Sequence, residues 1–164
     1  MTTRWKPSAT VAAIIAREAG GVTEFLLVEE HTPEGLRLNN PAGHLDPGES
    51  PVEGCAREAL EETAFHFRPT ALVGVYLSRF QRELADGRDD ITYLRFAFCG
   101  DLGDFVAGQA LDDGIVRTLW LSADAIRACP ERHRSPLLIQ CMDDYLAGRR
   151  HPLSVITTDA SVYG

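Results

Sequence analysis

The sequence predicts an α/β fold in which a mixed β-sheet is sandwiched between α-helices. Its 164 residues, 45% of them hydrophobic and 24% charged, match the size and composition of one globular unit, so we expect residues 1–164 to form a single domain. Runs rich in β-branched and aromatic residues alternate unevenly with helical patterns along the chain. Such uneven alternation favours a mixed sheet that packs between helices.

The N-terminal part reads as a hairpin followed by a long loop. Residues 10–16 and 25–28 are short apolar runs on either side of a Gly-Gly pair at 20–21, which is typical of two strands joined by a turn. Residues 31–48 are rich in Pro, Gly and Asn, and they predict a loop with one short strand near 36–38. Loops of this length often carry function.

A helix is predicted from Pro51 to Thr63. Pro51 suits the first helical position, and Ser50 and Glu53 form a capping box, in which each side chain accepts a hydrogen bond from the other residue's backbone N–H. One face of this helix is apolar, and we expect it to lie against the sheet. It consists of Val52, Cys55, Ala56, Ala59, Leu60 and Thr63.

The remaining elements follow from the same rules. Residues 72–80 and 91–99 predict strands joined across a turn at 85–88, and residues 115–121 predict a further strand. Ser122 is suited to cap a short helix after that strand. A last helix is expected to begin at Ser135-Pro136 and to end at Gly148. Its apolar face comprises Leu137, Leu138, Cys141, Met142, Tyr145 and Leu146.

The other side of the first helix is acidic. Glu58, Glu61 and Glu62 are spaced i, i+3, i+4, so their carboxylates converge on one patch, and Gly54 is expected to leave that surface open. Three like charges so close repel one another. Mg²⁺, which takes oxygen ligands and bridges carboxylates to substrate phosphates, would remove that repulsion. Arg57 is near enough to hold a carboxylate in one orientation.

A solvated acidic helix face is the alternative interpretation of these glutamates. The wider spacing favours a functional site, because the fixed residues read Gly43, five residues, Glu49, seven residues, Arg57-Glu58, two residues, Glu61-Glu62. This segment, residues 43–65, resembles the Nudix box, Gly-x5-Glu-x7-Arg-Glu-U-x-Glu-Glu-x-Gly-U, in which U is a bulky apolar residue. The chain is therefore similar to Nudix hydrolases.

The resemblance implies a Nudix fold, an α/β/α sandwich, and the hydrolysis of nucleoside diphosphates linked to another moiety with Mg²⁺ or Mn²⁺ as cofactor. Glu58 would position or deprotonate the attacking water, and Arg57 would orient a glutamate at the catalytic centre. Gly43 and Glu49 would support the loop before the helix. Carried over by position, the metal ligands would be Glu58, Glu61, Glu62 and the backbone carbonyl of Ala42. A divalent cation would support this hydrolysis in two ways, because it neutralises phosphate charge and activates a water molecule as the nucleophile.

Two positions depart from the family pattern. Ala64 stands where the family has Gly, a residue that usually takes a left-handed conformation after a helix. We therefore expect the helix either to run on or to end with slight strain. Ala59 is smaller than the Leu, Ile or Val usual at the first U position. Neither departure removes a metal ligand, so both concern local geometry.

Short segments outside the box are similar to the NudJ-type phosphatases of this family. They lie at 41–46, 94–98, 134–137 and 148–153. This likeness implies the removal of orthophosphate from nucleoside tri- and diphosphates or from thiamine-pathway pyrophosphates. The ADP-ribose and nucleotide-sugar pyrophosphatases stay open as an alternative, although their downstream proline has no match here. A module that binds nucleotides without hydrolysis is a further alternative, and the three retained glutamates count against it.

Candidate phosphate ligands lie on either side of the box. Arg95 falls in the middle of a predicted strand, where its guanidinium would meet a phosphate through two hydrogen bonds unless it faces outward. Arg37, just before the box, is a second candidate. His44 lies inside the box loop, the part of the Nudix box before the helix (residues 43–50), where it either contacts substrate or makes local hydrogen bonds.

Aromatic and acidic residues supply further candidates. Tyr76, Phe80 and Tyr93 either stack on a base or, as is commoner for aromatic residues, pack in the core. Asp112 and Asp113 precede the strand at 115–121, where many family members place another acidic ligand or base. A polar turn is the alternative interpretation of this pair.

Composition and charge restrict the kinds of molecule that we expect this protein to bind. The net charge is −8, from 16 Lys and Arg against 24 Asp and Glu, which argues against binding a nucleic acid polymer. The longest apolar run, residues 10–16, is far shorter than the ~20 residues of a membrane helix. The four cysteines lack CxxC spacing and are expected to be buried thiols. We therefore expect a small phosphorylated substrate, no membrane partner, a cytoplasmic location, and a monomer or homodimer.

Overall fold

The computed structural model describes residues 3–164, in which eight strands form two sheets. The first sheet has the order β5-β1-β7-β6, with β1 and β7 parallel and the other pairs antiparallel. In the second sheet, β3 pairs antiparallel with β2, β4 and β8. The strands are β1 (Ser8–Ile14), β2 (Ala16–Ala19), β3 (Val22–Thr32), β4 (Gly35–Asn39), β5 (Ala42–His44), β6 (Phe65–Leu84), β7 (Gly87–Phe105) and β8 (Ile115–Ser122).

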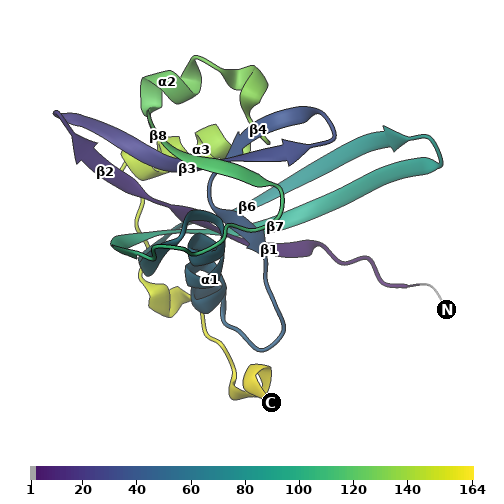
Figure 1. The fold of residues 1–164 in the computed structure, drawn as a ribbon. Coiled ribbons are helices and arrows are strands. Elements are labelled where there is room, and N and C mark those ends of the chain that lie inside the picture. The colour runs from purple at the N-terminus through teal and green to yellow at the C-terminus, as the bar shows by residue number, and fades with distance from the viewer. Residues whose placement is uncertain (1–2) are drawn as a thin grey trace.

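Helices lie on both sides of the strands (Figure 1). The α-helices are α1 (Pro51–Thr63), α2 (Ala123–Arg127) and α3 (Leu137–Leu146), and 3₁₀ turns occur at Pro130–Arg132, Leu153–Val155 and Ala160–Tyr163. Residues 11–15 show why both faces are covered, since their side chains alternate between two hydrophobic clusters. Val11, Ala13 and Ile15 pack toward α1, whereas Ala12 and Ile14 pack toward α2 and α3. The predicted α/β sandwich is confirmed, with its strands divided between two sheets.

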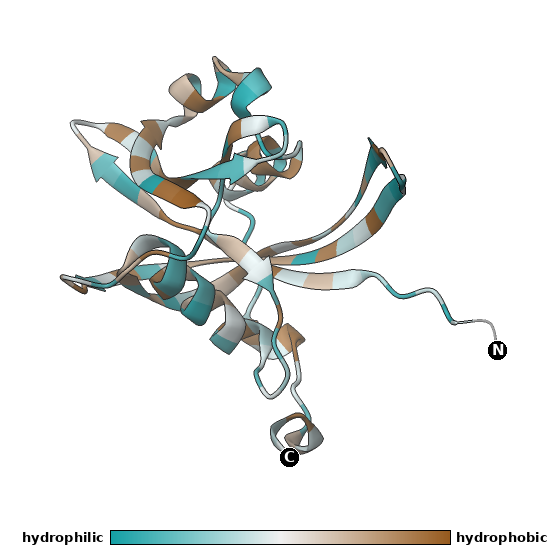
Figure 2. Ribbon diagram, turned by 45° about the vertical axis from the view of Figure 1, so that its right-hand side comes forward, coloured by the Kyte–Doolittle hydropathy of each residue, from teal (hydrophilic) through white to brown (hydrophobic). Residues whose placement is uncertain are grey.

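Helix α1 begins and ends where the sequence predicts. The Ser50 hydroxyl accepts from the Glu53 N–H at 3.2 Å, and the Glu53 carboxylate accepts from the Ser50 N–H at 2.7 Å. The buried face differs from the predicted stripe, because Glu58 and Glu62 are buried along with Cys55. Figure 2 shows hydrophilic, teal segments along this helix and hydrophobic, brown ones in the strands beneath it. The helix is therefore turned so that two glutamates point inward.

The hairpin of β6 and β7 is much longer than the predicted strands at 72–80 and 91–99. Pro69, which has no N–H to donate, is typical of a strand end, but here it lies on an edge strand beside a shift in register. Gly100 lets the strands approach, because a Cβ at this position would lie 2.0 Å from the Arg68 carbonyl oxygen. The distal half of the hairpin projects away from the rest of the molecule (Figure 1).

The predicted loop at 31–48 contains more strand than expected. The short strand near 36–38 is confirmed as part of β4, but β5 was not predicted. Strand β5 pairs with β1 in the register Thr10 with His44 and Val11 with Gly43, which brings the start of the Nudix box against the first sheet.

No helix of the described residues is long and apolar enough to cross a membrane. Three of the cysteine thiols are buried, at Cys55, Cys99 and Cys141, whereas Cys129 is partly exposed.

Candidate active site

Three carboxylates converge beside α1. Glu58 and Glu61 come from the helix and Asp112 from the loop between β7 and β8, and their oxygens lie within 4.8 Å of one another. A backbone hydrogen bond of 3.0 Å, from the Asp112 N–H to the Glu61 carbonyl, holds the loop in place. Within residues 3–164, this is the one cluster of at least three such side chains close enough to share an ion, and Asp113 is outside it. All its donors are carboxylate oxygens, which fits a hard divalent cation.

Arg57 connects the box loop to these carboxylates. Its guanidinium donates to both oxygens of Glu49, at 2.9 and 2.7 Å, and to the His44 carbonyl at 3.0 Å. A third nitrogen, Nη1, donates to Glu58 and to Glu61, each at 2.9 Å. Hydrogen bonding to Arg57 lowers the pKa of Glu49, so this carboxylate stays ionised. One side chain thus fixes the orientation of three glutamates.

Glu58 is almost fully enclosed. Burial raises the pKa of its carboxyl, and the nearby charges of Glu61 and Asp112 raise it further, against the lowering effect of Arg57. Gly43 provides the space, since a Cβ at this position would lie 2.1 Å from Glu58 Oε1. The absence of a side chain at Gly43 therefore allows Glu58 to reach the edge of β5.

Gly54 has a different role from the predicted one. The sequence suggested that it leaves the acidic surface open, but it is buried, and a Cβ there would lie 2.8 Å from Glu49 Oε1 and 3.1 Å from Leu45. The missing side chain therefore makes room for the box loop to pack on α1. That packing is what brings Glu49 to Arg57.

Glu62 lies apart from the three-carboxylate cluster. Its Oε2 accepts from the Ala42 backbone N–H at 2.9 Å, and the side chain is buried between α1 and β5. Burial raises the pKa of this carboxyl to about 8, although the Ala42 N–H lowers it. The metal-ligand role of Glu62 and of the Ala42 carbonyl stays a prediction.

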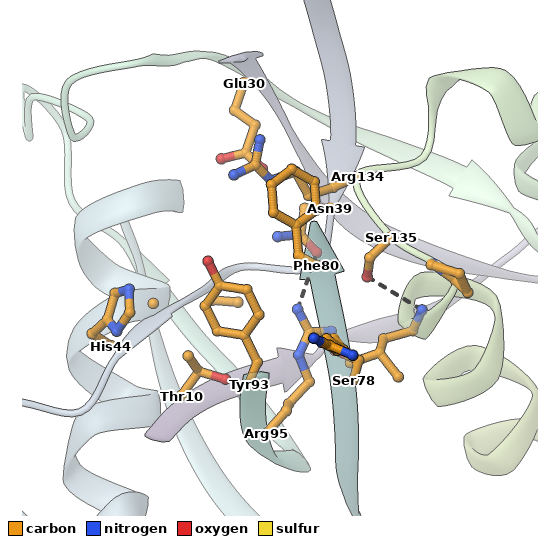
Figure 3. A pocket seen from close by; sticks show the side chains of 15 residues that line it. Thr10, Glu30, Asn39, His44, Ser78, Phe80, Tyr93, Arg95, Arg134 and Ser135 are labelled. Carbon is orange, nitrogen blue, oxygen red and sulfur yellow. Dashed lines mark hydrogen bonds and ion pairs between the residues drawn. The ribbon is translucent and has the colours of Figure 1, made fainter. Parts of the chain in front are cut away.

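A cavity of about 270 Å³ adjoins the carboxylates. Gly43 and His44 form part of its lining, and Gly43 also contacts Glu58, so the cavity and the carboxylate cluster meet at β5. Its walls come from both sheets and from the segment before α3 (Figure 3). The arrangement suits a ligand that enters between the sheets and places one end beside the carboxylates.

Arg95 lies in this cavity rather than on the outer surface. Its side chain is 7% exposed, Nη2 donates to the Asn39 Oδ1 at 3.4 Å, and Nη1 has no hydrogen-bond partner in the described part of the chain. A buried guanidinium nitrogen without an acceptor is suited to bind an anionic group. Arg37, in contrast, is not part of the cavity lining and donates to the carbonyl of Leu36 at 2.9 Å.

The predicted aromatic residues divide between core and cavity. Tyr76 is in the core and donates to Asp144 at 2.7 Å, whereas Phe80 and Tyr93 line the cavity. The Tyr93 ring lies 6.1 Å from the His44 ring, centroid to centroid. The sequence did not single out Glu30 or Asn39, which also line the cavity. Only the fold brings Glu30 and Asn39 to the cavity. Arg134, which also lines it, lies in the segment 134–137 that is similar to the NudJ-type phosphatases.

Comparison with known proteins shows the family to which this chain belongs. The NUDIX domain family matches residues 6–139. The chain is 34% identical over 152 residues to the protein named Phosphatase NudJ of Escherichia coli strain K12, covering 93% of this chain and 92% of that protein. The NUDIX hydrolase from Nitrosomonas europaea is 46% identical with a TM-score of 0.81, covering 94% of this chain and 98% of that one.

A more distant structure has the same fold. The MutT protein from Methanosarcina mazei Go1 is 25% identical, with a TM-score of 0.63, and the match covers 90% of this chain and 99% of that one. The family match spans most of the chain and contains the acidic helix, the loop that precedes it and Asp112. The chain therefore belongs to the Nudix family and is a hydrolase that acts on phosphoanhydride bonds.

Proposed function

We propose that this protein is a Mg²⁺-dependent phosphatase of nucleoside tri- and diphosphates or of thiamine-pathway pyrophosphates, and that it releases orthophosphate. The main observation behind the proposal is that the carboxylate cluster and the cavity lie next to each other at β5. The carboxylate cluster of Glu58, Glu61 and Asp112 suits a divalent cation, and the adjoining cavity holds the free Nη1 of Arg95. A substrate with both a phosphate chain and an organic group would occupy the two together.

The metal would be held by residues of α1 and its neighbouring loops. Glu58, Glu61 and Asp112 are candidates by their proximity, and Glu62 and the Ala42 carbonyl by their position in the Nudix box. When bound, Mg²⁺ or Mn²⁺ neutralises phosphate charge and lowers the pKa of a water molecule. Asp112 extends the set implied by the box, because the loop hydrogen bond to Glu61 holds it beside the helix.

The protein's own residues then divide the work of hydrolysis. Glu58 takes a proton from the attacking water, and Arg57 Nη1 holds its carboxylate in position for that role. The water oxygen bonds to the terminal phosphorus as the bond from that phosphorus to the bridging oxygen breaks, and the bridging oxygen leaves with the electron pair. Arg95 binds and neutralises the phosphate chain, and His44 contacts the substrate at the cavity mouth.

The identity to Phosphatase NudJ supports release of orthophosphate over other cleavage patterns. Glu58, Glu61 and Asp112, with Arg57 and Arg95, all belong to this one chain. We accordingly propose that residues 1–164 act as one domain on a small phosphorylated substrate. We place the protein in the cytoplasm as a monomer or homodimer.

A substrate panel tests this proposal. It contains nucleoside di- and triphosphates, ADP-ribose, dinucleoside polyphosphates and thiamine-pathway pyrophosphates, each with and without Mg²⁺, and phosphorus NMR identifies the products. We expect turnover only with the cation, and orthophosphate as the first product from a triphosphate. Pyrophosphate as the first product, or a preference for ADP-ribose, would contradict the phosphatase assignment. Tight nucleotide binding without any turnover would indicate a binding module instead.

A further inference from the structure

The end of the cavity away from His44 has a polar wall. Glu30 comes from β3, Asn39 from β4 and Arg134 from the segment before α3. The backbone N–H of Arg134 donates to the Leu38 carbonyl at 2.8 Å, which fixes this segment beside β4. Figure 3 shows Glu30 and Arg134 together at one end of the cavity and His44 near the other. The wall is therefore built from rigid elements.

One atom in this wall lacks a donor. Glu30 Oε1 is buried and has no hydrogen-bond partner among residues 3–164. The Nε of Arg134 lies 3.6 Å away, which gives an ion pair but is too long for a hydrogen bond. Leaving a buried acceptor without a donor is unfavourable, so a ligand that donates a hydrogen bond to this atom would gain binding free energy there.

The neighbouring groups make Glu30 the available acceptor. Burial raises the pKa of the Glu30 carboxyl, whereas the charge of Arg134 and a hydrogen bond with the Asn39 side chain lower it, so part of this carboxylate is already engaged. The buried Oε1 still has no donor, because Asn39 Oδ1 is itself an acceptor for Arg95 Nη2 and Arg134 lies too far away. The side walls between Glu30 and the carboxylate cluster include the rings of Phe80 and Tyr93. A flat heterocycle suits this space, with its phosphates toward Arg95 and an N–H toward Glu30.

We propose that Glu30 determines specificity by accepting a hydrogen bond from the exocyclic amino group of the substrate's heterocycle. This inference rests on the proposed function and adds a substrate class to it, namely amino-substituted bases rather than their counterparts without that amino group. An oxo group at the same position would set an acceptor against the carboxylate. Sites that hydrogen-bond a substrate group discriminate strongly against analogues that lack it, because the protein group is then left unpaired.

Two pairs of nucleotides test the idea. Guanosine and inosine triphosphates differ only in one amino group, and in cytidine and uridine triphosphates an amino group is replaced by oxygen. At pH 8 with Mg²⁺, we expect kcat/KM to favour the amino member about tenfold or more in the pair that is turned over faster. A ratio near one in both pairs would overturn the inference.

Variants of Glu30 test whether this side chain causes the preference for amino-substituted bases. Glu30→Leu removes both acceptor oxygens and is expected to bring the ratio close to one, and Glu30→Gln, which loses the charge, to lower it severalfold. Glu24→Gln is the matched control, because Glu24 lies on the same strand but pairs with Arg17 on the surface. The control should keep the wild-type ratio. Wild-type ratios in both Glu30 variants would overturn the inference.

A binding measurement separates this inference from the proposed function. The probes are the β,γ-methylene analogues of the same four triphosphates, measured by calorimetry with Mg²⁺. If no compound of the substrate panel is hydrolysed, the phosphatase assignment fails, and the binding ratios still decide the role of Glu30. If hydrolysis occurs without any preference for the amino group, the Glu30 inference alone fails.

Discussion

Arg57 holds the Glu49 carboxylate through two hydrogen bonds, Nε to Oε2 at 2.9 Å and Nη2 to Oε1 at 2.7 Å. The same guanidinium donates to Glu58 and Glu61, so the box loop and the helix share one cation. Strong hydrogen bonding to these carboxylates raises the pKa of Arg57, which is therefore charged at any pH at which the protein is folded. The position of the proposed base thus depends on a residue that does not itself take part in proton transfer.

Replacing Arg57 with lysine should separate orientation from charge. Lysine keeps the positive charge but cannot contact three carboxylates in the planar geometry of a guanidinium, so Glu58 loses its fixed position. We expect kcat to fall about 10- to 100-fold with little change in KM. Steady-state kinetics check this, with Arg68→Lys, at the exposed pair with Asp101, as the control. An unchanged kcat in Arg57→Lys would show that Glu58 does not depend on Arg57.

Gly43→Ala should disable the site by steric means. The added methyl would lie 2.1 Å from Glu58 Oε1, so the carboxylate must move away from the edge of β5. We expect kcat to fall about 100-fold, because a small displacement of a catalytic group is enough for such a loss. The control is Gly103→Ala, whose Cβ would meet His66 at 3.2 Å in another part of the molecule. Wild-type kcat in Gly43→Ala would show that Glu58 tolerates displacement.

The C-terminus of α1 ends in a strained residue. Ala64 has φ +62°, in the left-handed region, and its N–H donates to the Leu60 carbonyl at 2.9 Å. The sequence predicts that the helix either runs on past Ala64 or ends there with slight strain. The structure shows the second outcome, because the helix ends and Ala64 has a positive φ. We expect Ala64→Gly to stabilise the protein by about 1 kcal/mol, measured by urea unfolding.

The same substitution inside the helix should have the opposite sign. Ala56→Gly is expected to destabilise the protein by about 1 kcal/mol, because glycine is a poor helix former and no positive φ is relieved there. If both variants lose stability, the left-handed conformation of Ala64 is not a source of strain.

Local signals in the sequence predict the bounds of α1 and two of the three clustered carboxylates, Glu58 and Glu61, but not the separate position of Glu62. The capping box around Ser50 and the spacing of Glu58 and Glu61 are set by neighbours in the chain. The buried face of α1 was not predicted, because it depends on what the helix meets. Glu62 turns inward to reach the Ala42 N–H, which only the pairing of β5 with β1 places there.

The cavity was harder to predict than the helix. Arg95 was identified from its place in a strand, but burial and the free Nη1 depend on how the two sheets face each other. Glu30 and Asn39 are adjacent only through the antiparallel pairing of β3 with β4. No motif marks such residues, because polar side chains of these types are common on any strand.

Glu62 should make the stability of the metal-free protein depend on pH. Its pKa is about 8 in the folded protein against 4.5 for the ordinary side chain, so the folded state binds the proton more tightly. The free energy of unfolding is therefore expected to fall as pH rises from about 4.5 to 8, by up to about 1.4 kcal/mol per pH unit. Urea unfolding in a chelating buffer measures this dependence.

Glu62→Gln removes the titrating group and keeps an oxygen for the Ala42 N–H. In this variant the fall in stability between pH 5 and 8 should shrink or disappear. The same slope in wild type and variant would mean that another group is responsible.

The most direct test of the account is the rate of Mg²⁺-dependent orthophosphate release by wild type and by Glu58→Gln. The variant keeps the shape of the side chain but cannot accept a proton from water. We predict an active wild type, a variant slowed by about 10²- to 10⁴-fold, and the same unfolding midpoint within a few degrees. Near-normal hydrolysis by Glu58→Gln would contradict the assignment of Glu58 as the base at the three-carboxylate cluster.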